Sequence, residues 1–181
     1  FIANGHVFPG IDEKHLGTTW KQANQLFHNE GGGRFREVTS QAGPAFQELH
    51  SARGAAFGDL DDDGDVDIVV NNIDEPPSLL RNDGGNASHW IGLRLAGAGR
   101  NRGAIGGRVT VVSGTLRQVK EIQAGSSHNS SNDPRLLFGL GASTAVERVE
   151  IRWPAGRVQT LTAPLPVDHY HVIREPDGSA P

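Results

Sequence analysis

The sequence predicts an all-β protein in two parts, partial blades of a β-propeller followed by a β-sandwich-like domain. Three observations support this fold class. The chain contains 24 Gly and 10 Pro among 181 residues, which suits short strands joined by tight turns. Apolar and polar residues alternate in many short runs, whereas no segment shows sustained helical periodicity. A short sequence pattern also occurs twice in the first half of the chain.

The first part, residues 1–88, contains this internal repeat. Residues 26–32 match residues 79–85 at an offset of 53. A period of about 40 to 50 residues in strand-rich sequence is typical of propeller blades, small sheets that bury their faces by stacking. The strands that we expect here are 34–39, 54–57, 66–71 and 78–82. They amount to about one blade and part of another. Residues 14–26 could hold a helical turn.

The second part, residues 89–176, consists of amphipathic runs, and residues 177–181 are a tail. In residues 91–95 and 149–153, apolar side chains alternate with Gly or charged residues, so each run has one apolar face. Further strands are expected at 108–113, 116–124, 135–138, 157–161 and 169–173. Roughly seven short strands at this spacing indicate a β-sandwich or a small barrel.

One loop, residues 59–67, is strongly acidic. It places Asp at its first, third, fifth, seventh and ninth positions and Gly64 at its sixth. Alternate carboxylates can curl around a hard cation, and Gly permits the sharp turn that this requires. An EF-hand would need a bidentate Glu at the twelfth position, but Val70 stands there within a strand-like run. We therefore expect a calcium ion, Ca²⁺, in a loop that joins two strands.

The residues of this loop are expected to act in different ways. Asp65 is expected to bind the ion through its backbone carbonyl, whereas Asp62 should point away from it. The expected side-chain ligands are Asp59, Asp61, Asp63 and Asp67. Without a cation, the close carboxylates would repel one another and oppose the fold. The alternative is an acidic, solvated turn.

Charge and composition restrict the partners of the chain. The formal net charge is −4, but residues 1–88 carry −8 and residues 89–181 carry +4. The Arg residues of the second part are mixed with Gly and do not alternate with aromatics, so we expect no nucleic-acid partner. No apolar stretch reaches about 18 residues, so we expect no membrane span. The chain has no Cys and no Met, and we expect a mature product or a cut piece without disulfides.

Few residues are candidates for catalysis. His169 and His171 share one face of a strand at a spacing that could hold two metal ligands, but no third ligand is evident. His128 lies in a polar loop that lacks the strand–turn–helix context of a nucleophile elbow. The carboxylates considered for glycoside hydrolysis are Glu147, Glu150 and Asp168. The sequence does not place any two of them across a sugar, so we expect no enzyme.

Two stretches resemble known families. Residues 53–70 resemble the FG-GAP or VCBS calcium repeat of integrin-like β-propellers. The following chain resembles the ASPIC/UnbV domain of cartilage acidic protein-like secreted proteins, and the matching stretches are 89–93, 101–109, 133–135, 138–141 and 153–156. Gly103, Gly107 and the pair Ser130 and Ser131 depart from the usual pattern. The resemblance implies an extracellular setting, bound calcium, and adhesion or ligand binding.

These observations predict a non-catalytic, calcium-binding extracellular module for cell adhesion or ligand binding. It would be secreted or at the cell surface, in the extracellular space or the periplasm, and its partner would be a protein or a glycan. The alternative is a calcium-dependent enzyme that acts on polysaccharide, or an accessory domain of such an enzyme. Because partial blades leave strand edges unpaired, we also expect pairing with a second copy or with an upstream segment.

Overall fold

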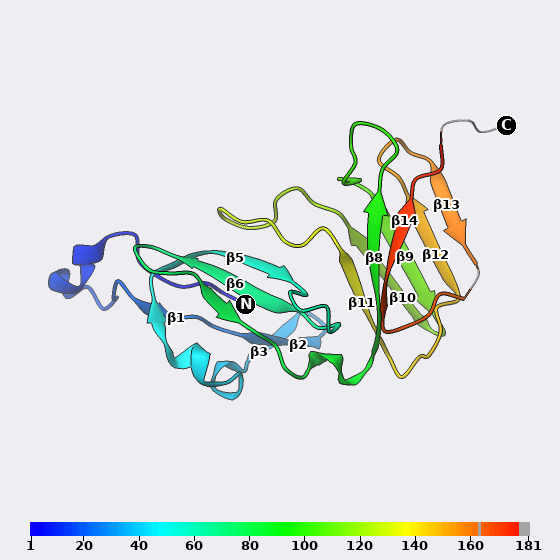
Figure 1. The fold of residues 1–181 in the computed structure, drawn as a ribbon. Helices are drawn as coiled ribbons and strands as arrows, with labels where there is room; N and C mark the ends of the chain where they lie inside the picture. Colours follow the sequence, from blue (N-terminus) through cyan, green and yellow to red (C-terminus); the bar gives the residue numbers. More distant parts are fainter. Residues whose placement is uncertain (163, 178–181) are drawn as a thin grey trace. The chain divides into compact units, whose positions relative to one another are not determined.

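The computed structural model describes residues 1–162 and 164–177 and confirms the all-β fold (Figure 1). The helical elements of this described part are the 3₁₀ turns η1 (Pro9–Lys14), η2 (Thr39–Gln41), η3 (Pro44–Gln47) and η4 (Gly85–Ala87). The described residues form two compact units. The first contains Phe1–Ala56, Ile68–Arg81 and Ser127–Ser130, and the second contains Phe57–Asp67, Asn82–Ser126 and the described residues from Ser131 onward.

The first unit is built on three small sheets. β1 (Gln22–Ala23) pairs with β4 (Leu49–His50), and β2 (Phe27–Gly31) forms an antiparallel hairpin with β3 (Arg34–Glu37). The third sheet has the order β5 (Ala52–Gly58), β6 (Asp67–Asn72) and β7 (Ser78–Leu80). Gly31, Gly32 and Gly33 all have positive φ, so the turn between β2 and β3 requires residues that lack a Cβ.

The two copies of the sequence repeat pair differently. Residues 26–32 lead into β2, and its partner β3 follows directly in the chain. Residues 79–85 begin in β7, which pairs with β6 and is an edge strand of its sheet among the described residues. The strand of the first copy is thus the first strand of a hairpin, whereas the strand of the second copy is the edge strand of a three-stranded sheet.

The helical turn considered for residues 14–26 is not formed. Instead, η1 ends at Lys14, where this segment begins. His15 and Gly17 then adopt φ values of 52° and 75°. Left-handed backbone at two nearby positions stops a right-handed helix, and the chain continues into β1.

The second unit contains two sheets that form a β-sandwich (Figure 1). One sheet has the order β11 (Leu136–Gly141), β8 (His89–Ala96), β14 (His169–Arg174). The other has the order β10 (Leu116–Glu121), β9 (Arg108–Ser113), β12 (Arg148–Arg152), β13 (Val158–Leu161). Neighbouring strands of both sheets are antiparallel except β14 and β8, which run parallel.

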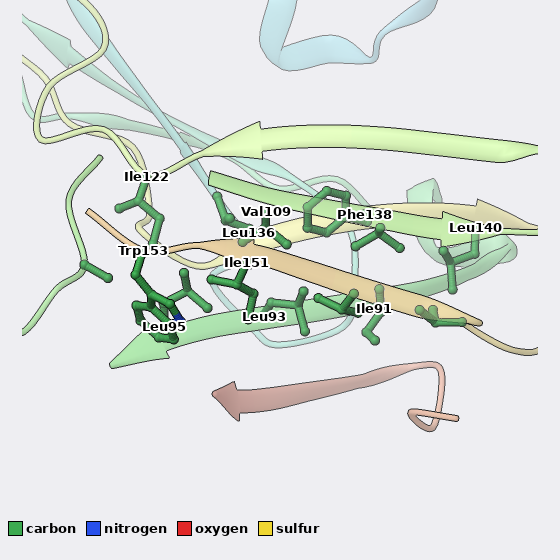
Figure 2. Packing of buried hydrophobic residues seen from close by; sticks show 14 residues of the cluster. Ile91, Leu93, Leu95, Val109, Ile122, Leu136, Phe138, Leu140, Ile151 and Trp153 are labelled. Carbon is green, nitrogen blue, oxygen red and sulfur yellow. The ribbon is translucent and has the colours of Figure 1, made fainter. Parts of the chain in front are cut away.

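Both sheets contribute to one apolar core (Figure 2). The alternation predicted for β8 and β12 buries Leu93 and Ile151 completely. Phe138 of β11 and Trp153, which follows β12, are the largest fully buried side chains. Full burial of a side chain of this kind contributes about 1.5–3 kcal/mol relative to exposure. The cluster therefore gives the sandwich a strong apolar driving force.

All strands expected in the second part are found, with shifts of a few residues at their ends. In the first part, β3, β5, β6 and β7 correspond to expected strands, whereas β1, β2 and β4 are not predicted. Two of these three are only two residues long, too short to show an alternating pattern. Within the described residues, no helix has the length and apolar character needed to cross a membrane.

Candidate metal centre

The acidic loop, residues 59–67, runs from the end of β5 to the start of β6 and belongs to the second unit. Asp62 and Gly64 adopt φ values of 61° and 94°, which turn the chain sharply. A Cβ on Gly64 would lie 2.0 Å from the indole ring of Trp90. Glycine is thus required here both for its backbone conformation and for the approach of an aromatic ring.

The loop brings together a carboxylate trio, Asp59, Asp61 and Asp67. Each offers one oxygen atom, and these atoms all lie within 4.8 Å of one another. Asp59 and Asp67 are only 2% and 1% exposed, whereas Asp61 is exposed. Buried carboxylates at this separation repel one another, and their oxygen atoms are the ligands that a hard cation such as Ca²⁺ prefers.

Backbone amides orient the two buried members of the trio. Asp59 accepts hydrogen bonds from the N–H groups of Asp63 (3.1 Å) and Gly64 (2.9 Å). The N–H groups of Leu60 and Asn82 each donate to Asp67 at 2.9 Å. The carboxylates are therefore held in place by the turn itself and by the segment that follows β7.

Asp63 and Asp65 lie outside the trio. The Asp63 carboxylate accepts hydrogen bonds from the Asp65 N–H (3.1 Å) and from the side-chain amide of Asn86 (2.9 Å). Oδ2 of Asp65 accepts from the Gly85 N–H at 3.0 Å, but its Oδ1 is buried and has no hydrogen-bond partner among the described residues. Burial raises the pKa of the Asp65 carboxyl, and the neighbouring carboxylates add to this rise.

Asp62 is separate from the trio and pairs with Arg135, which precedes β11. The Arg135 guanidinium also donates to the backbone carbonyl of Asp59 and to Asp133 Oδ2, the latter at 2.7 Å. Burial by itself would lower the pKa of Arg135, but the bonds to Asp62 and Asp133 outweigh it and raise the pKa. The sequence alone does not predict this role of Arg135, because no local pattern connects it with a loop more than 70 residues earlier.

Tyr170 of β14 is a second residue whose contact with the loop the sequence does not predict directly. Its hydroxyl donates to Oδ2 of Asp59 at 2.8 Å, and burial together with this bond raises the pKa of Tyr170. The sequence does contain one signal for it. Gly92 interrupts the alternating strand β8 and pairs with Tyr170, and a Cβ on Gly92 would lie 2.2 Å from the tyrosine ring. A glycine inside a strand often marks such a close approach.

Two family models match the chain. An FG-GAP-like repeat model matches residues 15–70, which include the acidic loop, and an ASPIC and UnbV model matches residues 97–180, which include Arg135 and Tyr170. The chain carries an FG-GAP-like repeat followed by an ASPIC/UnbV domain. This confirms the architecture that the sequence resemblance predicts. No curated protein matches the chain.

Between the two matches, residues 71–96 are covered by neither family model. The predicted boundary between residues 88 and 89 falls in this interval and stays a prediction. FG-GAP repeats are typical of extracellular proteins, so the chain has the domain composition of an extracellular module.

A pocket of about 410 Å³ lies beside the acidic loop in the second unit. Its lining combines charged and aromatic groups with apolar residues of the ASPIC/UnbV domain, and includes Asp59, Lys120, Ile122, Asp133, Leu136 and Tyr170. Such a mixed lining can contact both the polar groups and the apolar surface of a ligand.

In the described part of the chain, the His and carboxylate residues considered for catalysis do not converge on one site, and several of them have separate hydrogen-bond partners. The His169 and His171 rings lie 6.4 Å apart, and each ring contacts a backbone carbonyl, that of Asp168 or Pro166, at 2.8 Å. Asp168 pairs with His89 at 2.7 Å, and Glu147 accepts a hydrogen bond from the Gly114 N–H at 3.1 Å. Among the described residues, the trio is the only group of three or more His, Asp or Glu side chains close enough to share a metal ion.

Proposed function

We propose that the chain is a non-catalytic extracellular module that binds calcium in its acidic loop and a protein or glycan on its surface. The carboxylate trio of Asp59, Asp61 and Asp67 carries this proposal. The buried Oδ1 of Asp65, which has no hydrogen-bond partner among the described residues, supports it independently. A buried acceptor oxygen without a donor is costly, and a nearby cation would offset that cost.

Calcium suits this loop better than other common metals. The available ligands are oxygen atoms, and the chain has no Cys to form a thiolate site. Calcium accepts six to eight oxygen ligands in flexible geometry, whereas magnesium requires a tighter octahedron and keeps several waters. The Asp63 carboxylate and the backbone carbonyl of Asp65 complete the proposed ligand set around the trio. Oδ1 of Asp65 is not a proposed ligand, but the charge of the ion would also offset the cost of its burial. The ion would supply positive charge that cancels the repulsion between the carboxylates.

The proposed ligand-binding role rests on the family match and on the pocket. Extracellular proteins operate at high calcium concentrations, where sites with dissociation constants of about 10⁻⁴–10⁻³ M are occupied. The pocket beside the loop offers a place where a protein side chain or a sugar could bind close to the calcium site. Secretion, adhesion and glycan binding are parts of this proposal.

Calorimetric titration with Ca²⁺ and Mg²⁺ tests the metal site. We expect the wild-type chain to bind Ca²⁺ more tightly than Mg²⁺, and Asp61→Asn and Asp63→Asn to lower calcium affinity about tenfold or more. Asp62→Asn should cause a much smaller loss, since Asp62 is not a proposed ligand and asparagine keeps an oxygen for Arg135. Asp74→Asn, in the first unit, is the control outside the loop. Equal losses at Asp61, Asp62 and Asp63 would show a diffuse acidic patch instead of a site.

A glycan array combined with product analysis tests the non-catalytic part. Saturable, calcium-dependent binding that leaves the glycan intact is the expected outcome for a glycan ligand. Release of shortened glycan in the same incubation, abolished by chelation, would contradict the proposal and establish the polysaccharide-active alternative.

A further inference from the structure

Three contacts from the sandwich hold the acidic loop within the second unit. The first is the bond from the Tyr170 hydroxyl to Oδ2 of Asp59, at 2.8 Å. The same oxygen accepts the Gly64 N–H at 2.9 Å. Two donors on one carboxylate oxygen restrict the rotation of the carboxylate, so Tyr170 helps to set where the oxygens of Asp59 point.

The second contact is the Arg135 guanidinium, which bonds the loop at Asp62 and at the backbone carbonyl of Asp59. The Arg135 Nε–H also donates to Oδ2 of Asp133, at 2.7 Å, which fixes the orientation of the guanidinium. The guanidinium also lies 4.5 Å from the centre of the Tyr170 ring. A planar group with several fixed donors can bridge these acceptors simultaneously, which a lysine ammonium cannot do in the same geometry.

The third contact is the Trp90 indole on Gly64, at the position that any Cβ would occupy. The Trp90 and Tyr170 rings lie 5.2 Å apart, and Trp90 is buried. Trp90, Tyr170 and Arg135 therefore form one packed series along the acidic loop. All three belong to the same compact unit as the loop.

We infer that Tyr170 and Arg135 are positioning residues of the calcium site, so that calcium binding in the FG-GAP loop is coupled to the ordering of the ASPIC/UnbV sandwich. The inference rests on the proposed calcium function. Groups that orient metal ligands commonly change metal affinity by about 10–100-fold when they are removed. Coupling is reciprocal, so an ion that favours the ordered loop also favours the sandwich contacts that orient it.

Calcium titration of Tyr170→Phe tests the first positioning residue. Phenylalanine keeps the ring between Trp90 and Arg135 but cannot donate to Asp59. We expect calcium affinity to fall about tenfold. The matched control is Ile173→Val, on the same strand, whose side chain packs against the apolar core and should keep wild-type affinity. Arg135→Lys keeps the charge but loses the planar set of donors, and a similar fall is expected; this variant also serves if Tyr170→Phe does not fold.

Amide hydrogen exchange gives a readout that a purely structural role would not change. In the wild-type chain, calcium should slow exchange in β8 and β14, and this calcium-dependent slowing should be reduced in Tyr170→Phe but not in Ile173→Val. Wild-type calcium binding with unchanged affinity in both Tyr170→Phe and Arg135→Lys would overturn the inference and leave the proposed function intact. A wild-type chain that does not bind calcium would overturn both.

Discussion

The two compact units bury apolar side chains differently. In the second unit, 14 buried residues form one cluster to which both sheets of the sandwich contribute. The buried apolar side chains of the first unit are Ile11, Phe46, Ala52, Ala55 and Val70. Its short strands also expose large apolar side chains, with Phe35 at 63% and Leu79 at 61%. A continuous core stabilises the sandwich, whereas the first unit buries few large apolar side chains and pairs its short strands in three small sheets.

The largest expected difference between the two units is in the loss of stability caused by the same substitution, Leu→Ala. Leu93→Ala in β8 removes a fully buried side chain from the core and should destabilise the protein by about 2–5 kcal/mol. Leu79→Ala removes a side chain that is 61% exposed and should change stability by no more than about 0.5 kcal/mol. Urea unfolding of both variants measures the difference. Similar losses would show that Leu79 is covered in solution.

Calcium removal should have the next largest effect and should act on the second unit. If the ion binds only the native state, calcium at a hundredfold excess over its dissociation constant contributes about 2.7 kcal/mol. Chelation should therefore lower the melting temperature, and magnesium should restore little of the loss. Limited proteolysis identifies the affected unit, because new cleavage sites should lie mainly in the sandwich. Cleavage confined to the first unit would contradict the assignment of the loop to the second.

Strand pairing through the first unit is expected to be a smaller effect. β7 is an edge of its sheet among the described residues, and Leu79 on this strand is exposed. A lysine on an edge strand opposes pairing with another chain, so Leu79→Lys should reduce self-association. Leu16→Lys places the same charge on an exposed residue outside any strand and is the control. Light scattering at micromolar concentration measures the mass, and a single-chain mass for the wild type would refute the expectation.

The smallest expected effect is a difference in acid sensitivity. Hydrogen bonds from Lys21 and His50 hold the pKa of Glu75, in the first unit, below its ordinary value of 4.5. His89 likewise lowers the pKa of Asp168, in the second unit, below 3.8. A carboxyl whose pKa is depressed by folding stabilises the native state above its ordinary pKa, and this contribution is lost as the pH falls through the folded value.

The contribution of Glu75 should therefore begin to decline at a higher pH than that of Asp168. Proteolysis of the wild type and of Glu75→Gln over a descending pH series tests the contribution of Glu75, and the same series with Asp168→Asn tests the order. The wild type and Glu75→Gln should differ most above pH 4.5, the ordinary pKa of the glutamate, and converge in stronger acid. A difference that grows as the pH falls would have the wrong sign.

The sequence predicts the sandwich well because its strands repeat with a period of two. Apolar side chains at alternate positions of β8 and β12 do reach the core, as Leu93 and Ile151 show. The same reasoning fails for β1 and β4, because two residues cannot display a period. The helical turn considered for residues 14–26 has no periodic pattern behind it, and a left-handed His15 ends the helical segment there.

In the acidic loop, too, the sequence predicts contacts between neighbouring residues but not contacts with distant ones. The spacing of Asp59, Asp61 and Asp67 predicts that they approach one another, because a tight turn brings alternate residues together. Tyr170 lies 111 residues from Asp59 along the chain, and no local pattern joins them. Gly92 is the one sequence feature that indicates the contact, since its missing side chain leaves space for the tyrosine ring.

The position of β14 beside β8 has a consequence for the order of events during synthesis. The turn bond from the Asp63 N–H to Asp59 spans four residues and can form as soon as the loop leaves the ribosome. The bond from Tyr170 needs a residue made 111 positions after Asp59, about 6–22 s later at ordinary elongation rates. During that interval the acidic loop has its local turn but lacks the tyrosine. Among the described strands, the sandwich strand that completes the loop is therefore the last to be made.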